Sequence, residues 1–177
     1  FIPLAEGNGF ISNLGYWSLE ECCKKFNCTS SNKTSMGLSV NVSGFQFRDS
    51  DFVRNVLTIL DRTSFNPTRL QVELTEATLV DEQVSINDIF AELRSHGIKI
   101  AIDDFGTGFS SFSYLQRFSF DVLKLDRSLI SRLGSSARAQ VVVGSMQHLA
   151  ERLEFKIIAE GVETVKEMSC LLYTSPS

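Results

Sequence analysis

Acidic side chains, one asparagine and one lysine end or follow a series of short apolar segments in this chain of 177 residues. These polar ends are Asn41-Val42-Ser43, Glu73-Leu74-Thr75-Glu76, Asp103-Asp104-Phe105-Gly106, Lys124-Leu125-Asp126 and Glu160-Gly161-Val162-Glu163. If the segments are parallel strands, these ends meet at one mouth, because the active sites of parallel α/β folds lie at the carboxyl ends of the strands. Many carboxylates would then surround Lys124, the one basic side chain among them.

Such a concentration of negative charge has a specific chemical consequence. Carboxylates held a few ångströms apart raise each other's pKa or require counter-cations. Carboxylate and carboxamide oxygens suit hard ions such as Mg²⁺ or Mn²⁺ better than zinc. Two such ions about 3.5 to 4 Å apart would activate a water molecule and stabilise the oxygens of a phosphoryl displacement. The segments therefore predict a two-metal site that acts on a phosphate ester.

Each segment alone also has an ordinary structural explanation. A carboxylate after a strand usually caps a helix, and Asp103-Asp104 precedes the kind of glycine loop in which Asp is common. Glu76 and Glu163 fit a helix start as well as the edge of a site. Gly106-Thr107-Gly108 lacks the full spacing of a nucleotide-binding fingerprint and is interpreted as a shaping loop. Lys124 is harder to explain structurally, because a lysine inside an apolar strand needs a partner.

Apolar, β-branched segments alternate with segments of helical period, which is typical of βα units around a parallel sheet. We expect strands at Leu38–Val42, Leu70–Leu74, Ile98–Asp103, Val122–Leu125 and Phe155–Ala159. We expect helices at Trp17–Phe26, Ser50–Thr63, Glu82–His96, Ser110–Phe118 and Ala137–Leu153. Five strands fit either an open doubly wound sheet or part of a (β/α)₈ barrel, which needs about 250 residues. Length favours the open sheet unless the chain is truncated.

The composition, with 43% hydrophobic residues, is that of one globular domain. A net charge of −4 and a pI near 5.2 argue against DNA or RNA as a partner, because such proteins hold phosphates mainly through clustered Lys and Arg. The four cysteines lack metal-ligand spacing and are interpreted as thiols of a cytoplasmic protein. No apolar segment approaches the roughly 18 to 20 residues of a membrane span, although a parent protein could be anchored through other domains.

A series of ordered motifs resembles the EAL domain, a family with a (β/α)₈ TIM-barrel-like fold that hydrolyses cyclic di-GMP to linear pGpG in bacterial second-messenger signalling. The motifs are Phe1-Ile2-Pro3-Leu4-Ala5-Glu6, Asn41-Val42-Ser43, Glu73-Leu74-Thr75-Glu76, Asp103-Asp104-Phe105-Gly106-Thr107-Gly108, Lys124-Leu125-Asp126 and Ala159-Glu160-Gly161-Val162-Glu163-Thr164. They extend over residues 1 to about 168. The strings DDFGTG and AEGVE are together highly specific.

The resemblance implies a role for each matching residue. One metal ion would be held by Asn41, Glu73 and Asp103, and a second by Asp103, Asp104 and Glu160. Lys124 would orient the attacking water, while Asp126 and Glu160 would position or deprotonate it. Glu76 would steady the loop from Phe105 to Ser111, which in the family connects the metal site with a dimer surface. Asp104 and Glu163 would also face the substrate.

The same resemblance implies an incomplete domain. The Glu-Ala-Leu motif of the family's first strand and the family's last strands are missing, so we expect a partial EAL domain over 1–168, inactive alone, and an irregular or non-native tail over 169–177. The implied partners are cyclic di-GMP, a second copy in a homodimer, and fused sensory or diguanylate cyclase domains. Two alternatives stay open: a catalytically silent EAL-like module that binds cyclic di-GMP or a protein, and an unrelated metal-dependent phosphohydrolase or aldolase-type barrel.

Overall fold

The structure, a computed structural model, describes residues 1–29, 36–79, 86–107 and 112–174. Five strands form a sheet in which each neighbouring pair is parallel. They are β1 (Leu38–Asn41), β2 (Leu70–Thr75), β3 (Lys99–Phe105), β4 (Val122–Leu125) and β5 (Lys156–Ala159). The expected strands are thus confirmed, with ends that differ by at most two residues.

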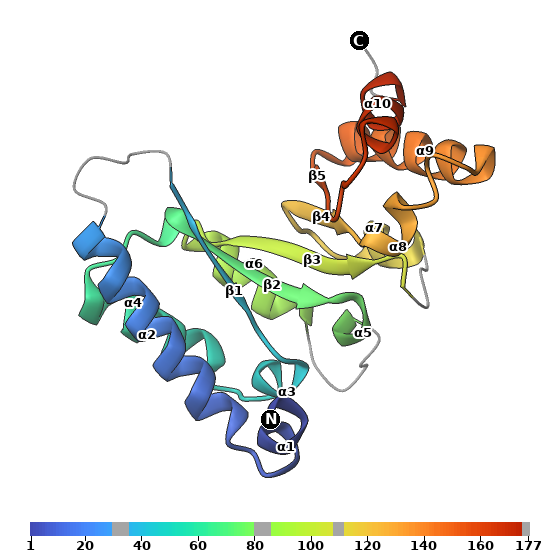
Figure 1. Cartoon of the computed structure of the whole chain (residues 1–177). Helices are drawn as coiled ribbons and strands as arrows, with labels where there is room; N and C mark the ends of the chain where they lie inside the picture. Colours follow the sequence, from blue (N-terminus) through green and yellow to red (C-terminus); the bar gives the residue numbers. More distant parts are fainter. Residues whose placement is uncertain (30–35, 80–85, 108–111, 175–177) are drawn as a thin grey trace.

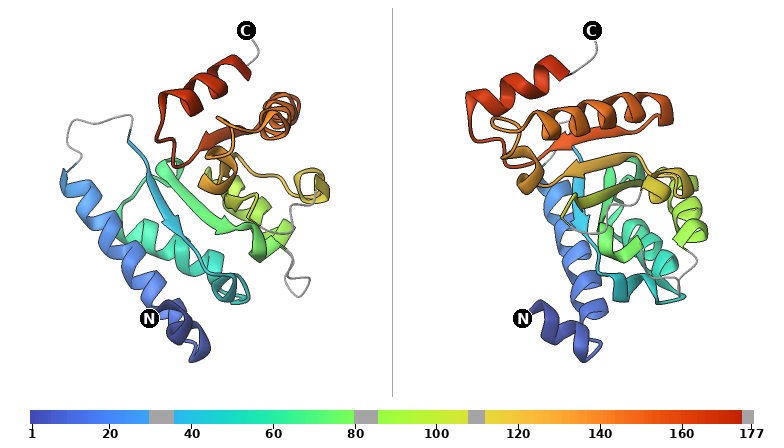
Figure 2. Two further views of the ribbon diagram at one scale, coloured as in Figure 1. Left: turned by 45° about the vertical axis from the view of Figure 1, so that its right-hand side comes forward. Right: turned by 90° about the vertical axis from the view of Figure 1, so that its right-hand side faces the viewer.

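Helices α2, α4, α6 and α9 lie along the outer side of the curved sheet, as Figures 1 and 2 show. The longer helices are α2 (Ile11–Thr29), α4 (Phe52–Thr63), α6 (Ile86–Ser95), α9 (Ala137–Leu153) and α10 (Val165–Thr174). The shorter ones are α1 (Ile2–Gly7), α3 (Gly44–Phe47), η1 (Pro67–Arg69), α5 (Glu76–Leu79), α7 (Phe112–Arg117) and α8 (Arg127–Ile130). The bounds of α9 match the prediction, whereas the predicted starts of α6 and α7 fall outside the described residues.

The order of the strands decides between the two folds that the sequence pattern left open. The strands lie side by side in chain order, from β1 to β5. A doubly wound sheet reverses its strand order at a switch point and carries helices on both faces, whereas a (β/α)₈ barrel keeps chain order with helices outside. The fold is therefore an incomplete TIM-barrel-like α/β fold, and the expectation of an open sheet from length alone is wrong.

Local sequence explains where the elements begin and end. In α4, the apolar positions Phe52, Val53, Val56, Ile59 and Leu60 recur at helical spacing and are all buried. The helix ends at Ser64, whose φ of 54° is left-handed. Gly97, with a φ of 81°, follows α6 in the same way and donates its N–H to the carbonyl of Arg94.

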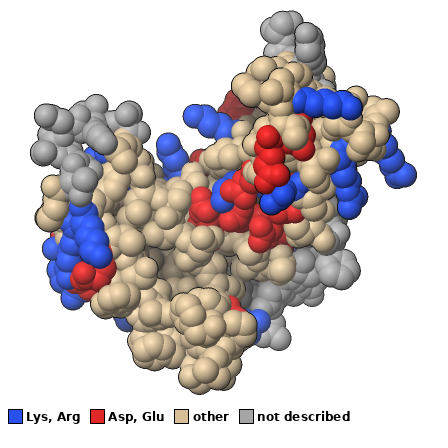
Figure 3. Space-filling view, in the orientation of Figure 1, with Lys and Arg blue, Asp and Glu red and all other residues tan. Residues whose placement is uncertain are grey.

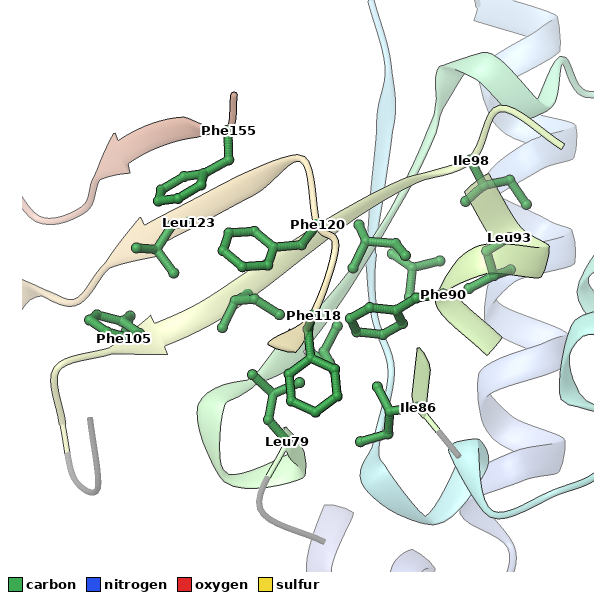
Figure 4. Packing of buried hydrophobic residues seen from close by; sticks show 14 of the residues in the cluster. Leu79, Ile86, Phe90, Leu93, Ile98, Phe105, Phe118, Phe120, Leu123 and Phe155 are labelled. Carbon is green, nitrogen blue, oxygen red and sulfur yellow. The ribbon is translucent and has the colours of Figure 1, made fainter. Parts of the chain in front are cut away.

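The hydrophobic core lies between the sheet and the helices on its outer side (Figure 4). Aromatic rings form much of it: the rings of Phe120 and Phe155 lie 4.8 Å apart, and Phe90 meets Phe118 edge to face at 6.1 Å. Leu123 is fully buried beneath β4. Every second residue of a strand is apolar, and its side chain points outward to the helices. The side chains between them, many of which are polar, therefore lie on the opposite face of the sheet.

The end of the described chain is helical. Helix α10 packs against α9 and extends through residues 169–174, for which we expected irregular structure. Leu171 and Cys170 contact the core, so an apolar face is what orders this segment. Whether residues 169–177 are native stays a prediction. The cysteines are free thiols, and no described helix is both long and apolar enough to cross a bilayer.

Candidate active site

The inner face of the sheet carries the polar side chains in rows. Strand register places Asn41 beside Glu73 and Thr75 beside Asp103. One row nearer the strand starts, Ser39 lies beside Gln71. Because alternate residues of a strand share a face, Gln71, Glu73 and Thr75 project to the same side. In Figure 3, acidic side chains gather on the wall of the central hollow, with basic side chains next to them.

A β-bulge shapes the end of β3. The pairing of β3 with β4 shifts between Ile102 and Phe105, so that Asp103 and Asp104 together occupy the space opposite Lys124. Asp104 has a φ of 56°, a left-handed conformation that Asp tolerates better than most residues. Its N–H donates to the Asp103 carboxylate at 2.9 Å. The bulge thereby presents two consecutive carboxylates to the mouth, where a regular strand would turn one of them outward.

Lys124 joins carboxylates of β2, of β3 and of the residue that follows β5. Its ammonium lies 2.9 Å from Oε2 of Glu73, 3.0 Å from Oδ2 of Asp103 and 2.7 Å from Oε1 of Glu160. The side chains of Glu73 and Asp103 are only 8% and 13% exposed, and that of Lys124 is 13% exposed. The three donors of a lysine ammonium are thus matched by three acceptors in a poorly solvated position. Four of the predicted strand-end residues, Glu73, Asp103, Lys124 and Glu160, therefore meet.

The pKa values of this cluster follow from the contacts. Burial raises the pKa of Glu73, but hydrogen bonds from Lys124 and Gln71 outweigh burial and hold that pKa below its usual range. Burial lowers the pKa of Lys124, yet its bonds to the three carboxylates raise that pKa above its ordinary value. Burial and the neighbouring charge of Asp103 raise the pKa of Asp104. The contacts therefore favour the ionised forms of Glu73 and Lys124, whereas the surroundings of Asp104 disfavour its ionised form.

The other predicted site residues surround this centre at greater distances. Asn41 is exposed on β1 beside Glu73. Asp126 is the N-cap of α8, where its Oδ1 accepts from the N–H of Ser128 at 2.8 Å. Hydrogen bonds from the side chain and then the backbone of Ser128 lower the pKa of Asp126. Asp126 therefore has the capping role that the structural explanation offered, and its charge still acts on Asp104.

The second glutamate of each pair also has a defined contact. Glu76 is buried at the start of α5 and accepts from the N–H of Gly106 at 3.3 Å. Its expected loop-steadying role stays a prediction, because residues 108–111 of that loop lie outside the described residues. Glu163 forms an ion pair with Arg127 at 3.0 Å, and both side chains are more than half exposed. Glu163 thus lies at the rim of the mouth.

Two contacts near the site were not anticipated from the sequence. Glu6 on α1 accepts from the hydroxyl of Ser43 at 2.5 Å, which ties α1 to the loop after Asn41. Gln71 donates from Nε2 to Glu73 at 2.9 Å. Glu6, Asn41, Ser43 and Glu73 line one pocket of about 780 Å³ beside β1. The sequence did contain a signal for the contact between Gln71 and Glu73. Gln71 is a polar residue two positions before Glu73 on the same strand, so both side chains must share a face.

The residues fit a hard divalent cation by donor chemistry. Among the described residues, no group of three or more Asp, Glu, His or Cys side chains is arranged so that it could hold a metal ion. Instead, Glu73, Asp103 and Glu160 each direct one oxygen at the ammonium of Lys124. These three segments of the chain can therefore present carboxylate oxygens to a single positive centre. Oxygen-only donors of this kind suit Mg²⁺, Mn²⁺ or Ca²⁺.

Comparison with known proteins gives a consistent family. The family model described as the EAL domain matches residues 1–173. The chain is 36% identical over 172 residues to the bifunctional diguanylate cyclase/cyclic di-GMP phosphodiesterase MucR of Pseudomonas aeruginosa. The alignment covers 97% of this chain and 25% of MucR, so the chain spans about a quarter of the length of that curated relative.

Solved structures agree with the sequence comparison. The PaMucR phosphodiesterase in complex with c-di-GMP superposes with a TM-score of 0.88 at 35% identity, covering 98% of this chain and 71% of that one. Klebsiella pneumoniae BlrP1, in a manganese/cy-diGMP complex, superposes with a TM-score of 0.81 at 28% identity, covering 92% of this chain and 41% of that one. These similarities extend the match from sequence to backbone.

Proposed function

Because the chain belongs to the EAL domain family, we propose that it forms part of a metal-dependent phosphodiesterase that hydrolyses cyclic di-GMP to linear pGpG in bacterial signalling. The observation that carries the proposal is the meeting of Glu73, Asp103 and Glu160 at Lys124. The similarity to MucR, named as a cyclic di-GMP phosphodiesterase, supports the substrate.

Specific residues would hold the metal ions. Asn41, Glu73 and Asp103 would bind one Mg²⁺ or Mn²⁺, and Asp103, Asp104 and Glu160 a second. Support comes from their oxygen-only donors and from the manganese complex of BlrP1. When bound, such ions would lower the pKa of a water molecule and neutralise charge on a phosphodiester.

The protein's own groups would perform the remaining steps. In hydrolysis, a water oxygen adds to one of the two phosphorus atoms and one phosphorus–oxygen ester bond breaks, which opens the ring. Lys124 would orient that water, and Asp126 or Glu160 would accept its proton. Asp104 and Glu163 would face the nucleotide, with Glu163 at the rim. Glu76 would hold the backbone at Gly106 in place.

The proposal extends to partners of the whole protein. The bifunctional name of MucR and the small share of MucR that this chain spans support a fused cyclase or sensory domain. A homodimer through the EAL domain is proposed from the family resemblance. Sedimentation of the full-length protein at several concentrations would test it: a mass that stays at that of one chain at all of them would exclude the dimer.

The decisive measurement is cyclic di-GMP turnover by the full-length protein with Mg²⁺ or Mn²⁺. The Glu73→Ala variant removes a buried carboxylate of the centre, and Glu20→Ala removes a partly buried, ion-paired carboxylate on α2 as a matched control. We expect metal-dependent formation of the linear dinucleotide, abolished in Glu73→Ala and unchanged in Glu20→Ala. Tight nucleotide binding without turnover would instead identify a catalytically silent module.

A further inference from the structure

Beneath the acidic centre lies a side chain to which the proposed reaction assigns no role. We propose that Gln71 is a positioning residue that fixes the orientation of the Glu73 carboxylate, so that one oxygen of Glu73 points toward the position of the cation. The inference rests on the proposed metal-dependent function, because Glu73 is a proposed ligand there.

Strand geometry puts Gln71 directly below Glu73. The two residues are two positions apart on β2 and therefore project from the same face of the strand. Gln71 pairs in register with Ser39 of β1, one row nearer the strand starts than the pair Asn41 and Glu73. Gln71 is thus held on a strand that is paired on both sides, where its backbone has little freedom.

The amide nitrogen of Gln71 uses both of its hydrogens. Nε2 lies 2.9 Å from Oε1 of Glu73 and 3.0 Å from the hydroxyl oxygen of Ser39. An ionised carboxylate only accepts hydrogen bonds, so the amide must turn its nitrogen and not its oxygen toward Glu73. The hydroxyl of Ser39 accepts the second hydrogen. The acceptor-only carboxylate of Glu73 therefore fixes the orientation of the amide, and the Ser39 hydroxyl is compatible with that orientation.

This arrangement gives each oxygen of Glu73 a donor of its own, and the Ser39 side chain is a further hydrogen-bond partner of the carboxylate. Gln71 holds Oε1, and Lys124 holds Oε2 from the opposite side. The residue Glu73 is 7% exposed, so little water is available to replace a lost donor. Without Gln71, the carboxylate could rotate about its terminal bond, since this torsion is broad. Partners that orient a metal ligand in this way typically change metal affinity 10- to 100-fold when removed.

The test compares Mn²⁺ binding with folding in the full-length protein. Gln71→Met removes the donor at similar size, and Gln71→Asn keeps an amide that is too short to reach Glu73. Gln140→Met is the matched control, because Gln140 on α9 donates a 2.8 Å bond to the carbonyl of Leu133, which is not one of the proposed site residues. Titration calorimetry without nucleotide measures Mn²⁺ affinity, and thermal unfolding in a chelator measures stability.

We expect both Gln71 variants to bind Mn²⁺ about 10- to 100-fold more weakly, with the melting temperature in chelator lowered no more than in Gln140→Met. The Mn²⁺ concentration for half-maximal hydrolysis should rise by the same factor, with kcat at saturating Mn²⁺ largely kept.

Two other results separate the inference from the proposed function. Unchanged Mn²⁺ affinity in both variants, or a loss that only follows loss of stability in chelator, would overturn the role of Gln71 while leaving the proposed enzyme intact. A wild-type protein that binds no Mn²⁺ would overturn the proposed function itself.

Discussion

The ammonium of Lys124 on β4 lies 2.9 Å from Oε2 of Glu73 on β2. The two strands are not neighbours, since β3 runs between them. On β3, the residue beside Glu73 is Ala101, which pairs with Glu73 of β2 on one side and with Val122 of β4 on the other. Its small side chain leaves the space that the lysine crosses. The ion pair therefore spans three adjacent strands.

Removal of the Lys124 charge should destabilise the fold strongly. Lys124→Met leaves the poorly solvated side chains of Glu73 and Asp103 without their cationic partner, and loss of one partner of a buried ion pair costs about 3 kcal/mol or more. We expect urea unfolding at pH 7 to show a loss of about 3 kcal/mol. Lys156→Met, at the exposed start of β5, is the control and should stay within about 0.5 kcal/mol of wild type. Equal effects of the two substitutions would contradict a central role of the ion pairs.

Glu73 should make stability depend on pH in a defined direction. Its pKa in the folded protein is below the ordinary 4.5, so its ionised form contributes stability that is fully present above about pH 4.5 and is lost as pH falls through the folded pKa. The difference in unfolding free energy between wild type and Glu73→Gln should therefore be constant from pH 7 to 5 and shrink below that. A difference that grows toward acid would mean that burial, not the donors, dominates the pKa.

The strands were predictable because each is a short, largely apolar segment with polar residues at or just after its end, as in Val122 to Leu125 before Asp126. The approach of acidic side chains from distant parts of the sequence to Lys124 was also predictable, because parallel strands bring their carboxyl ends to one edge of the sheet. The family motifs added the barrel, which length alone had argued against.

Other features depend on tertiary contacts that no local pattern encodes. The bulge at Asp103 and Asp104 follows from how β3 meets β4, which the spacing within β3 does not reveal. Helix α2 begins at Ile11 instead of the predicted Trp17. Glycine ordinarily weakens a helix, but Gly15 lies against the side chain of Gln46 and a larger residue there would not fit.

Gly15→Ala should reverse the usual effect of this substitution. In an exposed helix interior it stabilises by about 1 kcal/mol. Here the new Cβ would collide with the amide of Gln46, which is 4% exposed and accepts from the N–H of Ser43 at 3.1 Å. We expect a net loss of roughly 1 to 2 kcal/mol by urea unfolding. In a Gln46→Ala background the collision is gone, so the same substitution should become neutral or stabilising; a loss of equal size in both backgrounds would locate the cost elsewhere.

Gly161 should be the least replaceable glycine of the mouth, because two separate effects act on it. Its φ of 66° is strained for a residue with a Cβ, and that Cβ would lie 2.7 Å from Cγ of Arg127, close to the backbone where the arginine cannot move aside. Gly9, with a φ of 75° and nothing within 4 Å of its Cβ, isolates the conformational effect alone.

We expect Gly9→Ala to cost about 1 kcal/mol of unfolding free energy and Gly161→Ala about 2 to 3 kcal/mol. Gly161→Ala should also lower the rate of cyclic di-GMP hydrolysis, because the turn that it distorts connects Glu160, bound to Lys124, with Glu163, bound to Arg127. Urea unfolding and turnover measured on the same preparations would check both effects. Equal destabilisation at the two glycines would show that Arg127 yields, and that only the backbone conformation requires glycine at position 161.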